Sequence, residues 1–285
     1  MRGDFTVAVG EVPNAQRNAS IGTISKQLPL KVKDALKDTV RLGALTLIDS
    51  SVVDKFHASI SIYDTGLFTL SRSPGTYAGK AASSFMLLQN TSGVFYEYIQ
   101  GKVAPESVFI PLKETYNLNN YSALIFIAKL VPNEIHTITN PESLNIDFQL
   151  SSENGIAGVK VVTKNTILEE YTAQYMLVPK IPPAVISVRP GTPRCGGTVS
   201  FEFSRVEKAR GRYVSFLPGF DKNRNRPRVI AGFSKIDISG AANRGIKLVV
   251  ENVDWDGFVL YVSTEENITL VVVSVYWLAV DALVI

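Results

Sequence analysis

The sequence is dominated by a long series of short stretches in which apolar and polar residues alternate, rich in Val, Ile, Phe and Tyr. Examples are SVFIPL and YSALIFIAKLV in the first half, and TVSFEFSRV and GFVLYVS in the second. Gly, Pro, Asn or Ser separates most of them. Successive side chains of a strand point to opposite faces, so this pattern is typical of β-strands joined by turns. Many strands at short spacing predict an all-β protein with antiparallel sheets.

Helical periodicity is scarce. Residues 28–42 (LPLKVKDALKDTVRL) could hold one short amphipathic helix, and residues 165–176 (NTILEEYTAQYM) another, although YTAQYMLV also reads as a strand. A polar, glycine-bearing segment at residues 149–158 (QLSSENGIAG) is the best candidate for a domain boundary. We therefore expect two antiparallel β-sandwich domains with few short helices, at residues 1–150 and 156–285. A single elaborated jelly roll is the alternative.

The C-terminal run ITLVVVSVYWLAV, at residues 268–280, is long and apolar. A membrane-spanning helix needs roughly 20 predominantly apolar residues. This run is shorter, it is rich in β-branched residues, and Asp281 interrupts it. We therefore expect a buried strand here, not a membrane anchor.

Motifs of catalytic chemistry are missing from the chain. The sequence contains no zinc-binding spacing of His and Cys, no glycine-rich phosphate-binding loop and no serine nucleophile elbow. The two histidines, His57 and His136, lie in or beside apolar runs, and Cys195 is the one cysteine, which excludes an internal disulfide. We expect no enzyme activity and no catalytic, cofactor-binding or metal-binding residues. We also expect a protein that is not secreted and that lies in a reducing compartment such as the cytoplasm.

Charge is spread unevenly along the chain. Residues 189–247 hold thirteen basic and four acidic residues, a net charge of +9, so the remainder carries −6 of the overall +3. The segment FDKNRNRPRVI, residues 220–230, concentrates four of these cations. Such asymmetry is typical of a protein whose basic half contacts a polyanion.

Arginine outnumbers lysine in this half, and arginine favours bidentate contacts with phosphate. Alternating cations on an extended chain point the same way, so we expect a stripe that contacts an anionic membrane surface or single-stranded nucleic acid. The candidate anion-binding residues are Arg205, Lys208, Arg210, Arg212, Lys222, Arg224, Arg226, Arg228 and Lys235. Each cation contributes about 1 kcal/mol at an anionic membrane, so one copy would bind weakly and a homo-oligomer, a dimer or lattice, is implied.

The segments YMLVPKIPPAVISV and VSFLPGFDKNRNRPRVIAGFSKIDI resemble the C-terminal domain of matrix proteins of non-segmented negative-strand RNA viruses. The resemblance implies two β-sandwich domains and dimers that line the inner face of the host plasma membrane within the virion, in contact with lipid and a nucleocapsid. The matching residues are Lys180, Ile181, Pro182, Ala184, Val185, Val188, Ser234, Lys235 and Ile236.

A rival resemblance involves the segment VRLGALTLIDSSVVDKFHASISIYDTG, which is similar to the core of 30K-type plant-virus movement proteins. Those proteins place a strand like Leu42–Gly43–Ala44 before a strand that ends in an Asp, here Asp64. This resemblance implies binding of single-stranded nucleic acid. A jelly-roll capsid subunit is a third alternative.

Overall fold

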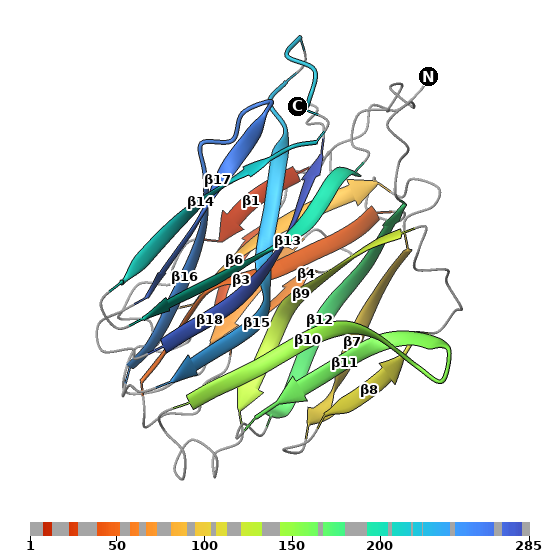
Figure 1. Cartoon of the computed structure of the whole chain (residues 1–285), viewed down its shortest axis with the longest axis vertical. Coiled ribbons are helices and arrows are strands. Elements are labelled where there is room, and N and C mark those ends of the chain that lie inside the picture. The colour runs from red at the N-terminus through yellow and green to blue at the C-terminus, as the bar shows by residue number, and fades with distance from the viewer. Residues whose placement is uncertain are drawn as a thin grey trace.

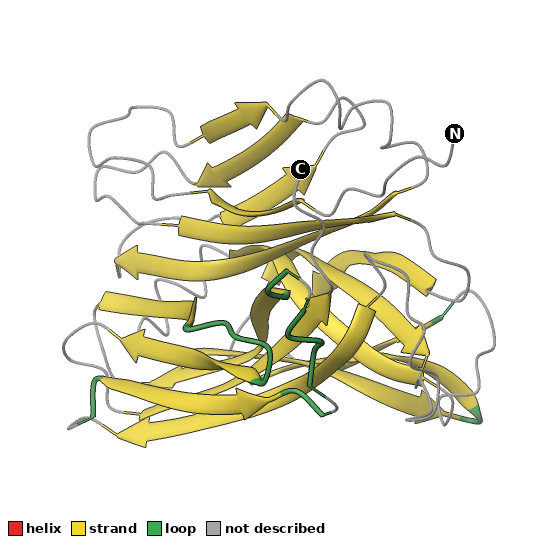
Figure 2. Ribbon diagram, turned by 90° about the horizontal axis from the view of Figure 1, so that it is seen from above, coloured by secondary structure: helices red, strands yellow, loops and turns green. Residues whose placement is uncertain are grey.

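The computed structural model describes the following residues: 8–12, 23–27, 39–51, 58–62, 67–72, 81–89, 95–103, 107–112, 121–132, 143–164, 168–179, 193–204, 207–217, 219–223, 225–239, 243–264 and 270–280. Every regular element within these residues is a strand. Three sheets of six strands form, and Figure 2 shows the strands stacked in layers. All the strand pairs are antiparallel, which confirms the predicted fold class.

The three sheets are labelled in Figure 1 by their strands. Sheet A has the order β1 (Ala8–Val12), β6 (Ala81–Gln89), β3 (Thr39–Ser51), β16 (Asn243–Glu251), β17 (Gly257–Thr264), β14 (Ala209–Ser215). Sheet B has the order β2 (Thr23–Gln27), β5 (Leu67–Arg72), β4 (Ala58–Ile62), β9 (Tyr121–Pro132), β12 (Leu168–Pro179), β7 (Phe95–Val103). Sheet C has the order β13 (Pro193–Ser204), β18 (Leu270–Val280), β15 (Arg228–Ser239), β10 (Ser143–Glu153), β11 (Ile156–Thr163), β8 (Val108–Pro111).

The apolar C-terminal run forms β18, in the interior of sheet C between β13 and β15. Val271, Val273 and Val275 alternate into the core, and the residues from Trp277 to Val280 are buried without alternation. The prediction of a buried strand is confirmed. Among the described residues, none belongs to a helix with the length and apolarity that crossing a membrane requires.

The segment predicted as a domain boundary, residues 149–158, is the tip of the β10–β11 hairpin. Asn154 and Gly155 both adopt positive φ, at 52° and 79°, which is the backbone that a tight two-residue hairpin turn needs. Each of the three sheets contains strands from both sides of this turn, because β3 pairs with β16, β9 with β12, and β8 with β11. The turn residues that suggested a linker therefore connect two neighbouring strands of one sheet.

The two helices predicted from sequence have different outcomes. Residues 168–176 belong to β12, as the alternative strand interpretation has it, so the helical interpretation is wrong for them, and residues 165–167 lie outside the described part of the chain. Tyr171, Ala173 and Tyr175 are buried there between strands β7 and β9. Of residues 28–42, those from Thr39 onward belong to β3, and residues 28–38 lie outside the described part of the chain.

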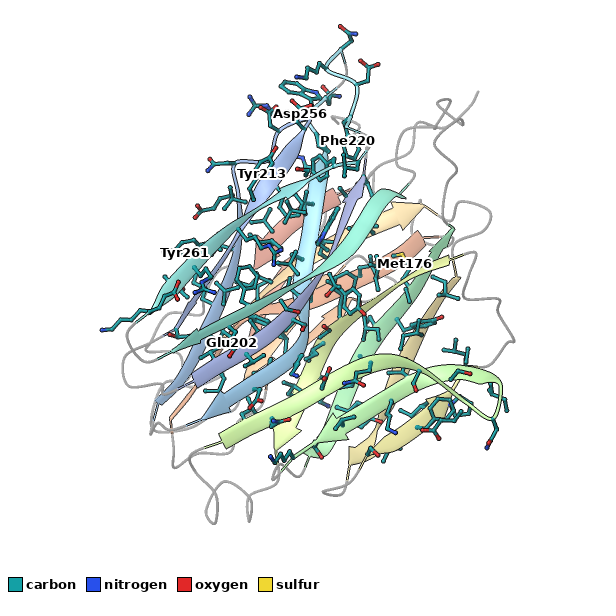
Figure 3. All side chains as sticks on the ribbon, in the orientation of Figure 1. Met176, Glu202, Tyr213, Phe220, Asp256 and Tyr261 are labelled. Carbon is teal, nitrogen blue, oxygen red and sulfur yellow. The ribbon has the colours of Figure 1, made fainter. Side chains whose placement is uncertain are left out.

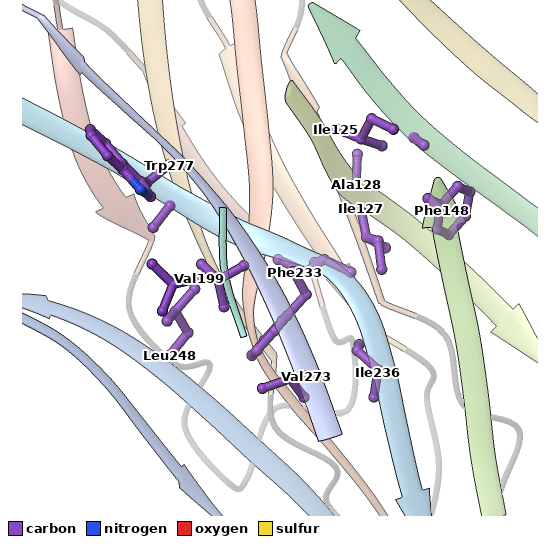
Figure 4. Close-up of a cluster of buried hydrophobic side chains, with 14 of the residues drawn as sticks. Ile125, Ile127, Ala128, Phe148, Val199, Phe233, Ile236, Leu248, Val273 and Trp277 are labelled. Atoms are coloured by element: carbon purple, nitrogen blue, oxygen red, sulfur yellow. The ribbon is translucent and has the colours of Figure 1, made fainter. Parts of the chain in front are cut away.

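The main hydrophobic core joins side chains of all three sheets. In one part of it, the sheet A strands β14, β16 and β17 pack against the sheet C strands β13, β15 and β18, and Figure 4 shows Val199, Leu248, Val273 and Trp277 within this cluster. Phe258 of β17 meets Trp277 of β18 with ring centroids 5.1 Å apart. The C-terminal strands therefore form a sandwich of three strands on three, which positions the loops described below.

A smaller core cluster ties this sandwich to the rest of the molecule. It contains Leu42, Ala44, Leu124, Phe126, Met176, Ile230, Leu278 and Val280, which come from all three sheets. At its centre β15 passes close to β3, because a Cβ added at Gly232 would lie 2.4 Å from the Cβ of Ala44. The absence of a side chain at Gly232 lets the two strands approach.

Candidate functional site

Two loops meet at one end of the C-terminal sandwich. The first joins β14 to β15, and the second, residues 252–256, joins β16 to β17. The backbone N–H of Phe216 donates to the carbonyl of Asp256 over 2.9 Å, and that of Phe220 donates to the carbonyl of Trp255 over 2.8 Å. We call the described residues within 216–227 and 252–256, together with the neighbouring Tyr213 of β14, the loop pair. Figure 3 shows Asp256, Phe220 and Tyr213 together at this end.

Aromatic packing beneath the loop pair explains why the first loop folds back. Phe216 and Phe220 are both buried, with ring centroids 4.8 Å apart in an edge-to-face contact. Phe216 also stacks on Phe258 at 5.4 Å and lies 6.0 Å from Trp277. Burying aromatic rings is strongly favourable, so the two phenylalanines anchor the loop, while Leu217 between them and the polar residues 221–223 after them face solvent.

Local hydrogen bonds shape both loops. In the second, Asn252 has a positive φ of 51°, and the N–H of Asp254 donates to the carbonyl of Gly257 over 2.8 Å. In the first, a carboxylate oxygen of Asp221 accepts from the backbone N–H of Asn223 over 2.9 Å, as in an Asx-turn. Asn and Asp favour these positions because they tolerate such backbone and complete its hydrogen bonds.

An ion pair joins the two loops. The Nζ of Lys222 lies 2.8 Å from a carboxylate oxygen of Asp256, and both side chains are largely exposed. The hydrogen bond to Asp256 and the charge of that carboxylate raise the pKa of Lys222, and Asp254 and Tyr213 act in the same direction. The ammonium group is therefore held in its charged form at the surface by Asp256.

Tyr213 presents an exposed aromatic ring beside this ion pair, with 57% of its surface accessible. The ring lies against the backbone at Gly257, where an added Cβ would come within 2.5 Å of the phenolic oxygen. Glycine at this position thus lets the ring approach the end of β17. An aromatic face with a polar tip, next to a carboxylate, can contact a ligand that is both apolar and hydrogen-bonding.

Arg226 stacks on the second loop. Its guanidinium carbon lies 5.1 Å from the ring centroid of Trp255, within the range of a cation–π contact. The backbone N–H of Trp255 donates to the carboxylate of Asp254 over 2.8 Å, and the indole packs partly against the main core. The surface of the loop pair therefore combines the rings of Tyr213 and Trp255 with an ion pair and an exposed arginine.

The nine cations predicted to bind an anion do not form one continuous stripe within the described residues. Strands β14 and β15 lie in different sheets, so they do not pair as a hairpin. Lys222, Arg226 and Arg228 belong to the loop pair or follow it directly, whereas Lys235 lies farther along β15 and reaches Asp147 of β10 at 3.6 Å. Lys208, Arg210 and Arg212 are exposed on or beside β14, and Arg205 and Arg224 lie outside the described part of the chain.

The guanidinium of Arg210 is already hydrogen-bonded to neighbouring residues. Its Nε and one terminal nitrogen donate to the two carboxylate oxygens of Glu207 over 2.8 and 2.5 Å, and its other terminal nitrogen donates to the carbonyl of Glu202. The hydrogen bond from Arg210 lowers the pKa of Glu207. A guanidinium whose fork is already occupied has few donors left for an external anion.

Reasoning from sequence missed the residues that give the loop pair its chemistry. Alternation of aromatic residues in the basic half is more typical of core positions than of binding surfaces. The structure does bury Phe201, Phe216, Phe220 and Phe233, but it exposes Tyr213. Trp255 and Asp256 were not identified at all. The available signal was the short segment DWDG, residues 254–257, where an aromatic residue lies between two carboxylates in a turn. Within the described residues, no group of three or more His, Cys, Asp or Glu could hold a metal ion.

Comparison with protein families gives a match in this region. The family model of the H-type lectin domain matches residues 212–280, which run from β14 to the end of β18 and include both loops of the pair. The match covers less than half of the 285 residues. Comparison with curated proteins and with solved structures finds no match.

Proposed function

We propose that the protein binds carbohydrate through the loop pair, without catalysing a reaction. The observation that carries this proposal is the coincidence of two findings. The residues similar to an H-type lectin domain include all or part of five of the six strands of the C-terminal sandwich, and the loop end of that sandwich presents an exposed aromatic side chain and an exposed carboxylate together. A lectin domain is a carbohydrate-binding domain, and the chemistry at Tyr213 and Asp256 suits that class of ligand.

The physical argument concerns the two surfaces of a sugar ring. Its C–H groups form an apolar face that can pack on an aromatic ring such as Tyr213, which is exposed. Its hydroxyl groups need acceptors and donors, and the carboxylate of Asp256 with the ammonium of Lys222 offers both within 2.8 Å of each other. A hydrogen bond to a charged group contributes about 1.5–3 kcal/mol, so a few such contacts give measurable binding.

The test is binding of the full chain to an array of immobilised glycans, followed by calorimetric titration of the best ligand. We expect Tyr213→Ala and Asp256→Asn each to weaken binding about tenfold or more, in keeping with one lost contact of this kind. Tyr261→Ala is the matched control, because Tyr261 lies on β17 away from the loops (Figure 3). An array without any bound glycan, or variants that bind like the unchanged protein, would contradict the proposal.

A second candidate function is the matrix-type role in which the basic half contacts an anionic membrane as part of an oligomer. One observation favours it: Leu217 is 85% exposed in the loop that also contains Lys222 and Arg226. An apolar side chain beside cations suits insertion into a lipid surface, which single cations bind only weakly. This role would place the protein in a virion or on the inner face of a host membrane.

Flotation with phosphatidylserine vesicles at low and high salt tests this second function. We expect Leu217→Asp to reduce the floated fraction severalfold, whereas Ile156→Asp, at a 50% exposed apolar residue on the β10–β11 hairpin, leaves it unchanged. Sedimentation of the same sample measures whether binding requires an oligomer. Absence of flotation at low salt would exclude the membrane role.

A further inference from the structure

Arg226 differs from the other cations in what holds it. Lys222, Arg210 and Lys235 each face a carboxylate, at 2.8, 2.5 and 3.6 Å. The guanidinium of Arg226 instead lies over the ring of Trp255, and within the described residues it forms no ion pair. A cation–π contact engages one side of the guanidinium, and the N–H donors that do not face the ring stay available to a ligand.

The backbone also restricts Arg226 before any ligand arrives. The next residue is Pro227, which disfavours helical backbone at the residue preceding it and keeps that residue extended. Pro227 is buried although both its neighbours are exposed, so it anchors this part of the loop to the protein. A side chain stacked on a ring and carried by a restrained backbone loses little conformational entropy on binding.

Arg228 supplies a second cation on the same side. Residues 226, 227 and 228 are exposed, buried and exposed, as expected for an extended segment whose alternate side chains point the same way. In such a segment, alternate residues lie roughly 7 Å apart. Arg228 is also without an ion pair among the described residues. Two guanidinium groups at this spacing can hold one or two anionic groups of a single ligand.

The carboxylates of the loop pair are partly compensated. Lys222 neutralises Asp256, and the carboxylate of Asp254 accepts the N–H of Trp255. A negatively charged ligand that approaches Arg226 is therefore repelled less than a simple count of acidic residues indicates. Asp256 remains available as an acceptor for hydroxyl groups, beside the exposed ring of Tyr213.

We propose that the saccharide bound by the loop pair is acidic, with its carboxylate or sulfate group held by Arg226 and Arg228 and its hydroxyl groups by Asp256 and Tyr213. This inference rests on the proposed carbohydrate binding and adds the charge class of the ligand. Arginine suits both groups, because its planar fork matches two oxygens of one anion.

The experiment compares the affinity of the full chain for two matched pairs of polysaccharides, at about 0.15 M salt so that unspecific attraction is screened. Dextran sulfate is paired with dextran, and polygalacturonate with its methyl ester. We expect the acidic member of at least one pair to bind about tenfold tighter or more than its neutral partner. The pair with the larger preference identifies sulfate or carboxylate as the recognised group.

Variants assign the preference to Arg226. We expect Arg226→Gln to weaken binding of the acidic polysaccharide about tenfold and to leave that of the neutral partner unchanged. Arg226→Lys keeps the charge without the planar fork and is expected to restore only part of the affinity. Arg212→Gln, which removes an exposed arginine of β14, is the control and should leave the preference intact. Thermal unfolding of each variant verifies that it is folded.

Two outcomes overturn the inference and are distinguishable from each other. Equal affinity for acidic and neutral polysaccharides overturns the acidic ligand, and a preference that survives Arg226→Gln overturns the assignment of its anionic group to Arg226. Either result leaves the carbohydrate-binding function standing. The second outcome is that the protein binds polyphosphate, single-stranded RNA or phosphatidylserine vesicles but no polysaccharide or glycan. This result overturns both the acidic saccharide and the carbohydrate-binding function, and it assigns the cations to another polyanion.

Discussion

On β17 and its neighbouring strands, some side chains pack into the core of the C-terminal sandwich and others lie exposed at its surface. Phe258 points inward and meets Phe216 and Trp277, whereas the adjacent residue Gly257 allows Tyr213 to lie against the surface. The tight approach at Gly257 and the aromatic packing below it hold the loop pair in one arrangement. Exposure of Tyr213 is thus a consequence of a missing side chain at its neighbour.

Residues whose pKa is raised by burial make stability depend on alkaline pH. Burial raises the pKa of Tyr276, and the nearby carboxylate of Asp147 acts in the same direction. The unfolded chain ionises its tyrosines near pH ~10, whereas folded Tyr276 stays protonated beyond that, so the unfolding free energy falls as pH rises through this window. We expect Tyr276→Phe to reduce this fall, as measured by urea unfolding between about pH 9 and 11. Tyr213→Phe, at an exposed ring, is the control, and an equal slope for both variants would contradict the argument.

Close approach at Gly232 is a second residue-scale feature with a measurable consequence. A Cβ there would lie 2.4 Å from the Cβ of Ala44 and 3.0 Å from a ring carbon of Phe126, which cannot move freely in the core. We expect Gly232→Ala to reduce the unfolding free energy by about 1–3 kcal/mol, the usual cost of overpacking. Gly211→Ala, on the exposed edge strand β14, should cost clearly less, because the nearest atom to the added Cβ is a ring carbon of the partly exposed Tyr261 at 3.2 Å. Chemical unfolding measures both, and a tolerated Gly232→Ala would show that β3 and β15 are farther apart.

At the scale of elements, the side chains on the inward face of β17 hold this strand in the sandwich. Phe258, Leu260 and Val262 are buried and Val259 is only partly so. We expect Phe258→Ala to lower the unfolding free energy by about 3–5 kcal/mol, because it removes a large side chain from a packed aromatic cluster. Val259→Ala removes a smaller side chain on the opposite face of the same strand and should cost far less. Urea midpoints compare the two variants, and similar losses would mean that β17 is not packed as described.

At the scale of the whole molecule, pairing between strands that are distant in sequence connects the two halves of the chain. The three sheets each combine strands from residues before and after the β10–β11 hairpin, and one core cluster joins all three sheets. A protein connected in this way is expected to unfold as one cooperative unit, although its length would allow two domains.

Spectroscopy can test this cooperativity directly. Both tryptophans, Trp255 and Trp277, lie in the C-terminal sandwich, so fluorescence reports on that part, whereas far-ultraviolet circular dichroism reports on strands throughout the chain. We expect the two signals to give coincident urea transitions. Separate transitions would instead support independent domains at residues 1–150 and 156–285.

The sequence by itself determined the all-β class and the burial of the strand at residues 270–280. Both follow from local patterns, the alternation of apolar and polar residues and the content of β-branched residues, which can be recognised without knowing the tertiary structure. It also located the basic segment at residues 220–230. Only the tertiary structure decided that β14 and β15 belong to different sheets, that Lys222 is neutralised by Asp256, and that Arg226 stacks on Trp255. These relations join residues about 30 positions apart, and they depend on strand pairing and loop closure that no local pattern encodes.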